Sequence, residues 1–190
     1  MTPVLQFPDA RRWRAWLTRN HRSPDGVWLK IAKKGAPGAS VSYAEALDEA
    51  LCFGWIDGQK KSHDRNAFLQ KFTPRRPRSI WSKRNIEHCE RLVAAGRMEP
   101  TGRAEIDRAK ADGRWGRAYE GSATMELPGD LLRAIEAQPE ALETFLTLNA
   151  QNRYAFAYRL HHLKTDAART RKIETFVAML ARGESIYPRR

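Results

Sequence analysis

Hydrophobic residues near the N-terminus repeat with the period of a helix. Trp13, Trp16 and Leu17 stand at positions i, i+3 and i+4, which is the spacing of one apolar helix face. Asp9 precedes them and has the side chain of a good N-cap. The pattern therefore predicts a helix that begins after Asp9 and ends near Asn20.

The period then changes to that of a strand. Over 27–32 the residues Val27, Leu29 and Ile31 alternate with Trp28, Lys30 and Ala32, which is the clearest strand signal in the chain. Weaker alternation over 55–58 and 67–72 predicts two antiparallel strands, and 60–66 between them is expected to form a hairpin loop. Residues 73–78 contain two prolines and are expected to be irregular.

Helix boundaries are marked by capping residues. Ser42 and Glu45 have the spacing of a capping box and predict a helix that ends near Phe53. Gly54 follows at the position where a helix often ends with a glycine. Ser82 is the expected cap of a later helix, and one more helix is predicted from 100 to 112.

Beyond residue 126 the apolar spacing is helical throughout. The stripes are Leu131/Leu132/Ile135, Leu142/Phe145/Leu146, Phe156/Leu160/Leu163 and Ile173/Phe176/Val177/Leu180. The sequence thus predicts an α+β fold in which a small, mainly antiparallel sheet packs with helices and an all-helical C-terminal region follows. The expected domains are 1–125 and 126–190.

Charge is distributed unevenly along the chain. The net charge is +12, and residues 60–84 carry nine Lys or Arg against one acid. Residues 125–150 carry five acids and one Arg, whereas 151–190 carry nine basic residues and three acids. Two basic blocks separated by an acidic one favour an electropositive face and an anionic small molecule or acidic protein as partner.

The sequence offers neither a membrane segment nor a disulfide framework. No apolar run reaches the roughly 18 residues of a membrane span, and the N-terminus lacks the pattern of a signal peptide. Cys52 and Cys89 lie in apolar helical patterns, and we interpret them as reduced thiols. We therefore expect a cytoplasmic protein without membrane insertion.

Two segments, residues 54–58 and 73–85, combine the residue types that bind anions. Ser82 opens a predicted helix, and arginines precede it on a proline-containing loop that has no acid over 72–85. A helix N-terminus with guanidinium groups is suited to phosphate or carboxylate, and Trp rings can stack on flat groups. The expected ligand-binding residues are Trp55, Asp57, Gly58, Arg75, Arg76, Ser79, Trp81, Ser82 and Asn85.

A purely structural interpretation of these residues is equally open. The loop can be a solvated connection, Asp57 can pair with an arginine, and both Trp rings can belong to the core. Trp115, in the Gly113-Arg114-Trp115 segment, is expected to pack on the sheet, with a pocket wall as the alternative.

Enzyme and nucleic-acid functions are the alternatives to a binding pocket. None of the common nucleotide, hydrolase or zinc motifs occurs, so we expect neither a cofactor nor a metal, and Asp57 is the weak candidate for a catalytic carboxylate. The basic character favours nucleic acid as a second partner class, although no DNA-binding motif is evident. A phosphate-binding stripe in the last helices would use Arg153, Arg159, Lys164, Arg169, Arg171 and Lys172, and an ordinary solvated helix surface is the favoured interpretation of these residues.

Several strings in order carry a resemblance to a known family. They are ALDEALCFGWIDG (46–58), FTPRRPRSIWSKRN (72–85), AAGRMEPTG (94–102), AKADGRWGRAY (109–119) and TRKIETFVAMLARG (170–183). Together they resemble the YdeI/OmpD-associated proteins. The resemblance implies an N-terminal α+β domain similar to YjbR/CyaY or DUF1801 and a helical OmdA-type domain after it. It also implies a role in bacteriocin protection or envelope stress, without catalytic residues to carry over.

Overall fold

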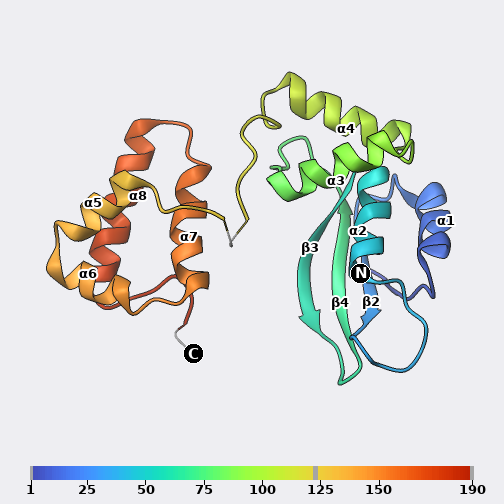
Figure 1. The fold of residues 1–190 in the computed structure, drawn as a ribbon, viewed down its shortest axis with the longest axis horizontal. Coiled ribbons are helices and arrows are strands. Elements are labelled where there is room, and N and C mark those ends of the chain that lie inside the picture. The colour runs from blue at the N-terminus through green and yellow to red at the C-terminus, as the bar shows by residue number, and fades with distance from the viewer. Residues whose placement is uncertain (1, 122–123, 189–190) are drawn as a thin grey trace. The chain divides into compact units, whose positions relative to one another are not determined.

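The chain folds into two compact units. The computed structural model describes residues 2–121 and 124–188, which form four strands and eight helices. Contacts divide these residues into a unit that ends at Ala118 and a unit that begins at Tyr119. The first is α+β and the second is entirely helical (Figure 1). The predicted fold class is confirmed.

The sheet of the first unit has the order β1-β2-β4-β3. Its strands are β1 (Val4–Leu5), β2 (Val27–Ala32), β3 (Trp55–Ser62) and β4 (Ala67–Pro74). β1 runs parallel to β2, and the other two pairings are antiparallel. The sheet is therefore mainly antiparallel, as predicted, and β1 was missed because two residues leave no periodic pattern.

The β3–β4 hairpin is longer than the sequence predicted. The expected loop at 60–66 was wrong at its start, because β3 continues to Ser62. Asp64 closes the short turn by accepting hydrogen bonds from the N–H groups of Asn66 and Ala67, each at 2.7 Å. β4 also includes Pro74, which pairs with Trp55 of β3. The first residue of β2, Val27, pairs with Phe72, so Pro74 lies beyond the β2–β4 pairing and β2 does not require its missing N–H.

The helices of the first unit begin at the predicted caps. They are α1 (Ala10–Asn20), α2 (Tyr43–Cys52), α3 (Lys83–Ala94) and α4 (Pro100–Ala111). The side chains of Asp9, Ser42 and Ser82 each accept a backbone N–H from the first turn of the helix that follows. Gly54 has a φ of 76°, so the glycine after α2 takes the left-handed conformation that ends the helix.

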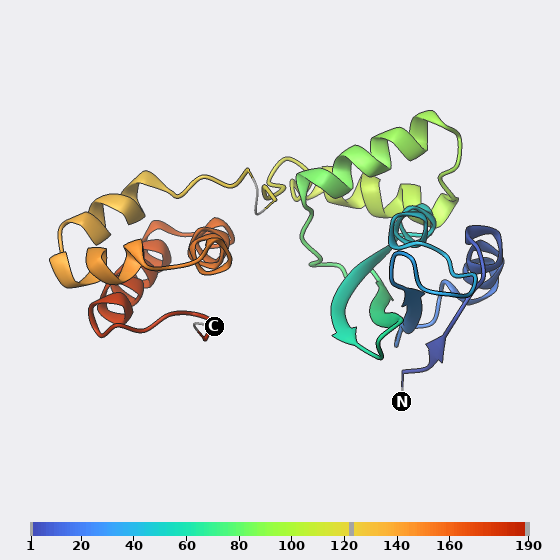
Figure 2. The same ribbon diagram turned by 60° about the horizontal axis from the view of Figure 1, so that its bottom comes forward.

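One face of the sheet forms the core of this unit. The alternation in β2 turns Val27, Leu29 and Ile31 toward Trp13 and Phe72, and all of them are buried. Figure 2 shows α2 nearly end-on, between the sheet and the pair α3 and α4. The helices thus cover one face of the sheet.

The second unit has a core of its own. Its helices are α5 (Gly129–Glu136), α6 (Pro139–Leu146), α7 (Ala150–His161) and α8 (Asp166–Ala181). Their predicted stripes supply buried Leu131, Phe145, Phe156 and Phe176. Arg169 of α8 donates two hydrogen bonds to the carboxylate of Asp130 in α5, at 2.6 and 2.8 Å, and so joins the first and last helices of the unit.

Candidate functional site

The loop between β4 and α3, residues 75–81, holds most of the predicted arginines; we call it the arginine loop. It begins with Arg75, whose backbone N–H donates to the carbonyl of Gly54 at 2.9 Å. The guanidinium carbon of Arg75 lies 3.4 Å from the ring centroid of Trp81, and Nη1 donates to the carbonyl of Ile80 at 3.1 Å. Because Arg75 is only 5% exposed, it stabilises the loop from within.

Both tryptophans of the predicted site are part of the core. Trp55 is 0% exposed and donates its indole N–H to the carbonyl of His21 at 2.8 Å. Trp81 is 2% exposed, and its ring lies 4.8 Å from that of Trp115. The expected stacking of these rings on a ligand therefore has to be corrected, because other side chains already cover them. Trp115 packs against the core, as expected.

The middle of the arginine loop turns sharply and presents its charges outward. Ser79 Oγ accepts the backbone N–H of Arg76 at 2.8 Å, and the N–H of Ser79 donates to the carbonyl of Arg76 at 2.9 Å. The carbonyl of Ser79 also accepts a hydrogen bond from Arg114 at 2.7 Å. Arg76 and Arg78 are exposed on this turn, so two cations project from a loop that is fixed at several points.

The start of α3 adds a further cation beside the loop. Ser82 Oγ accepts the N–H of Asn85 at 3.2 Å, so both residues serve the cap of the helix. Arg84 lies in the first turn and is exposed. No acid occurs over 72–85, and Asp112, which lies beside the loop, is paired with Arg114. The exposed arginines of the loop and of the start of α3 therefore give this surface a positive charge.

Asp57 and Gly58 belong to the sheet rather than to the loop. The carboxylate of Asp57 accepts a hydrogen bond from the hydroxyl of Tyr43 at 2.8 Å. Its observed partner is therefore a tyrosine, whereas the structural interpretation of the sequence suggested an arginine. Gly58 lies where the register of β3 shifts, and its carbonyl accepts from Gln70 at 3.0 Å. A catalytic role of Asp57 stays a hypothesis.

A network of charges between α2 and α3 was not anticipated from the sequence. Buried Glu49 binds the guanidinium groups of Arg14 and Arg97 at 2.7 and 2.6 Å. Beside it, Asp48 contacts His88 and Arg91 at 2.9 and 2.7 Å. The sequence shows only that Asp48 and Glu49 are neighbours in one predicted helix. Their partners come from three other segments. We interpret the network as structural because each carboxylate is paired.

The remaining reactive groups offer little further chemistry. Both cysteines are buried and without a disulfide, and burial raises the pKa of Cys89 to about 12, so it stays a thiol. Over residues 2–121 and 124–188, no three His, Cys, Asp or Glu side chains are placed to hold a metal ion. None of the helices in this part of the chain is long and apolar enough to cross a membrane.

The fold and the charged surface define an α+β domain with a basic loop, followed by a helical domain. A family model described as a domain of unknown function, DUF8412, matches residues 5–105, and the chain belongs to that family. A second model, described as bacteriocin-protection, YdeI or OmpD-associated (OmdA), matches residues 124–183. No curated protein and no solved structure matches the chain.

These matches bear differently on the resemblance seen in the sequence. The OmdA match supports the YdeI/OmpD-associated likeness through the helical unit. The likeness of the N-terminal domain to YjbR/CyaY or DUF1801 stays a prediction, because the family found there has no described function.

Proposed function

We propose that the protein is a binding protein for a phosphate- or carboxylate-bearing partner, which it holds at the arginine loop and the start of α3. Arg76, Arg78 and Arg84 would contact the anion, because their side chains are exposed and no acid occurs over 72–85. Guanidinium groups suit such ligands, since they donate two parallel hydrogen bonds to carboxylate or phosphate oxygens.

The single observation that carries the proposal is the rigid support under these cations. Arg75 is stacked on Trp81, and Ser79 is bonded both to Arg76 and to Arg114. A loop that is held in this way loses little conformational freedom when it binds, so more of the interaction energy appears as affinity. Trp81 and Arg75 act in this account as positioning residues and do not touch the ligand.

The description of the OmdA family suggests the setting of this binding. That description names bacteriocin protection, and we propose this role for the whole chain. The buried thiols of Cys52 and Cys89 fit a reducing compartment, which supports the cytoplasm as the place where it acts.

The experiment uses thermal unfolding of the full chain with and without inorganic pyrophosphate at low ionic strength. We expect pyrophosphate to raise the melting temperature of the wild type by a few degrees, since a ligand that binds only the folded state stabilises it. The double variant Arg76→Ala/Arg78→Ala should lose this response while its melting temperature without ligand stays close to that of the wild type.

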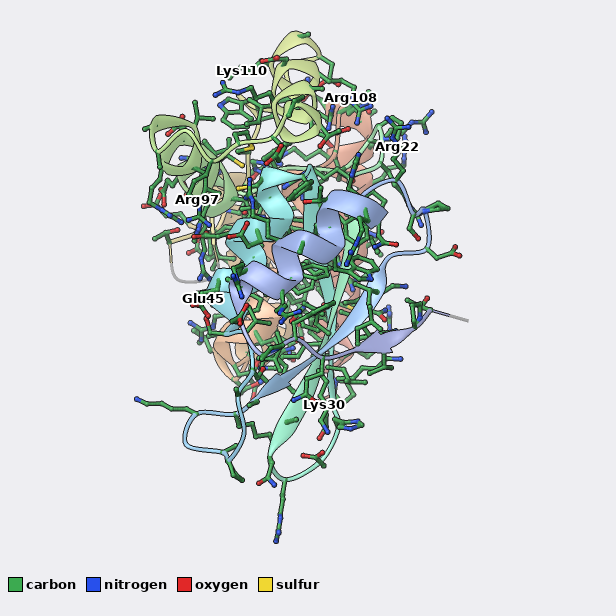
Figure 3. The ribbon with its side chains drawn as sticks, turned by 90° about the vertical axis from the view of Figure 1, so that its right-hand side faces the viewer. Arg22, Lys30, Glu45, Arg97, Arg108 and Lys110 are labelled. Atoms are coloured by element: carbon green, nitrogen blue, oxygen red, sulfur yellow. The ribbon has the colours of Figure 1, made fainter. Side chains whose placement is uncertain are left out.

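The matched control is Arg11→Ala/Arg22→Ala, which removes the same charge from exposed positions in and after α1. Figure 3 shows Arg22 extending outward from the loop that follows α1. This control should keep the pyrophosphate response. Equal responses in the wild type and in Arg76→Ala/Arg78→Ala, or no response in the wild type, would overturn the proposal.

A further inference from the structure

A tryptophan lies on the face of the sheet that the core does not use. Trp28 follows Val27 in β2, so its side chain points away from the face that packs against α1 and α2. Neither of the hydrophobic cores formed by the described residues includes Trp28. It is nevertheless only 9% exposed, and something other than the core must cover its ring.

Lysines provide part of that cover. The Nζ atom of Lys61 lies 4.5 Å from the centroid of the Trp28 ring, and that of Lys71 lies 5.8 Å from it. Ammonium groups at these distances interact with the π face of a ring rather than with its edge. The ring of Trp28 therefore lies beneath two ammonium groups on flexible side chains, which can move aside at small cost.

A β-bulge in β3 places Lys61 on this face. The register shifts between Asp57, which pairs with Phe72, and Lys60, which pairs with Gln70. Without the extra residue Lys61 would point toward the core face, because a shift by one position exchanges the two faces of a strand. The Gln70 side chain holds the bulge by donating to the carbonyls of Gly58 and Gln59, at 3.0 and 3.3 Å.

The bulge separates two neighbouring lysines. Lys60 lies on the core face with its Nζ 4.2 Å from the ring centroid of Phe68, whereas Lys61 lies over Trp28. The two residues are adjacent in one edge strand and carry the same charge. They consequently form a natural pair for testing which face of the sheet binds a partner.

Positive charge dominates the outer face, which we call the tryptophan face. By the strand register it consists of Val4, Trp28, Lys30, Ala32, Ile56, Lys61, Ala67, Leu69, Lys71 and Thr73. None of these described residues is acidic. Asp64 in the hairpin turn lies 3.6 Å from Lys30, and its carboxylate also accepts two backbone N–H groups. In Figure 3 Lys30 lies toward the hairpin end of the unit, opposite Arg108 and Lys110 on α4.

We propose that the tryptophan face binds single-stranded nucleic acid, with a base stacked on Trp28 and phosphates held by Lys61 and Lys71. A base can take the position of the ammonium groups over the ring, and each displaced ammonium gains a phosphate as its partner. Single strands are favoured over a duplex because stacking requires an unpaired base. This surface is separate from the arginine loop, and the inference does not depend on the function proposed there.

The experiment measures binding of the full chain to a fluorescein-labelled oligothymidylate by fluorescence anisotropy over a range of salt concentrations. Lys61→Ala/Lys71→Ala should weaken binding and reduce the slope of log affinity against log salt by about 1.4, for two phosphate contacts on a single strand. Trp28→Leu should weaken binding about tenfold and leave that slope unchanged, because stacking releases no counterions.

Two controls keep the test decisive. Lys60→Ala should bind like the wild type, and Lys61→Ala alone should bind more weakly, although each removes one lysine from the same strand. Should Trp28→Leu prove unstable, Trp28→Phe replaces it, and this variant should retain most of the affinity because it keeps a flat ring. The lysine variants test the proposal regardless of how the Trp28 variants fold.

Several outcomes would overturn the inference. They are equal losses for Lys60→Ala and Lys61→Ala, no effect of Trp28→Leu, and binding of inorganic polyphosphate or of anionic lipid vesicles that matches oligothymidylate and ignores Trp28. The last result would identify a surface for negative charge in general. The Arg76→Ala/Arg78→Ala variant tests the arginine loop separately, so failure of one proposal can be told from failure of the other.

Discussion

Adjacent arginines in the arginine loop have opposite environments. Arg75 is buried against the ring of Trp81, whereas Arg76 is exposed on the following turn. In the sequence they are two consecutive basic residues, and both were expected to bind the ligand. The two differ in their partners: Arg75 is bound to the carbonyls of Gly54 and Ile80, whereas the N–H of Arg76 is bound to Ser79 Oγ in the exposed turn.

This difference predicts unequal effects on stability. Arg75→Ala should lower the free energy of unfolding by about 2 kcal/mol or more, because it leaves a void beside Trp81 and removes a buried contact. Arg76→Ala should change it by no more than about 0.5 kcal/mol. Urea unfolding followed by tryptophan fluorescence measures both values, and equal effects would contradict the assigned environments.

At the scale of elements, charge pairing joins α2 to α3. Burial alone would raise the pKa of Asp48, but hydrogen bonds from Arg91 and His88 outweigh it and hold the pKa below its ordinary value of 3.8. A carboxyl group whose pKa is lower in the folded than in the unfolded state stabilises the fold above the unfolded pKa. This contribution is lost as the pH falls through the folded value.

Asp48→Asn is therefore expected to act in a pH-dependent way. Near neutral pH the variant should be about 2 kcal/mol less stable than the wild type, since two charged hydrogen bonds lose their anion. The difference should shrink as the pH falls below about 4, where the wild-type carboxyl also becomes protonated. Glu87→Gln, at an exposed position of α3, is the control and should change stability little at either pH. A difference that is constant with pH would contradict the pairing.

At the scale of the whole molecule, the unfolding of the two units can be followed by different spectroscopic signals. All six tryptophans lie at or before residue 115, so tryptophan fluorescence follows the first unit alone. Helical circular dichroism follows both units. The described residues of the two cores do not overlap, which leads us to expect that each unit can lose its structure separately.

Phe156→Ala tests this expectation. The side chain is fully buried in the second core, and its removal should cost about 3–5 kcal/mol within that unit. We expect the circular dichroism transition to begin at lower temperature while the fluorescence transition stays in place. Gln151→Ala, at an exposed position of the same helix, should move neither transition. A parallel shift of both signals would show that the units unfold together.

Most of the elements followed from local chemistry. The caps at Asp9, Ser42 and Ser82, and the left-handed glycine at Gly54, were predicted correctly because each depends on contacts within a few residues. The apolar stripes of the second unit supply most of its core, but Leu146 was predicted wrongly, since its side chain is 64% exposed. The limits of β3 and β4 were less accurate, since they depend on where the neighbouring strand ends.

The sequence by itself determined the α+β class, the helical C-terminal region and the acid-free basic stretch, because these depend on period, capping and charge along the chain. Only the tertiary structure decided which side chains face outward. It placed Trp55 and Trp81 inside the core and brought Lys61 over Trp28 on the other face of the sheet. The burial of the two rings depends on which elements pack over them, the position of Lys61 depends on one extra residue in β3, and neither is expressed in local sequence.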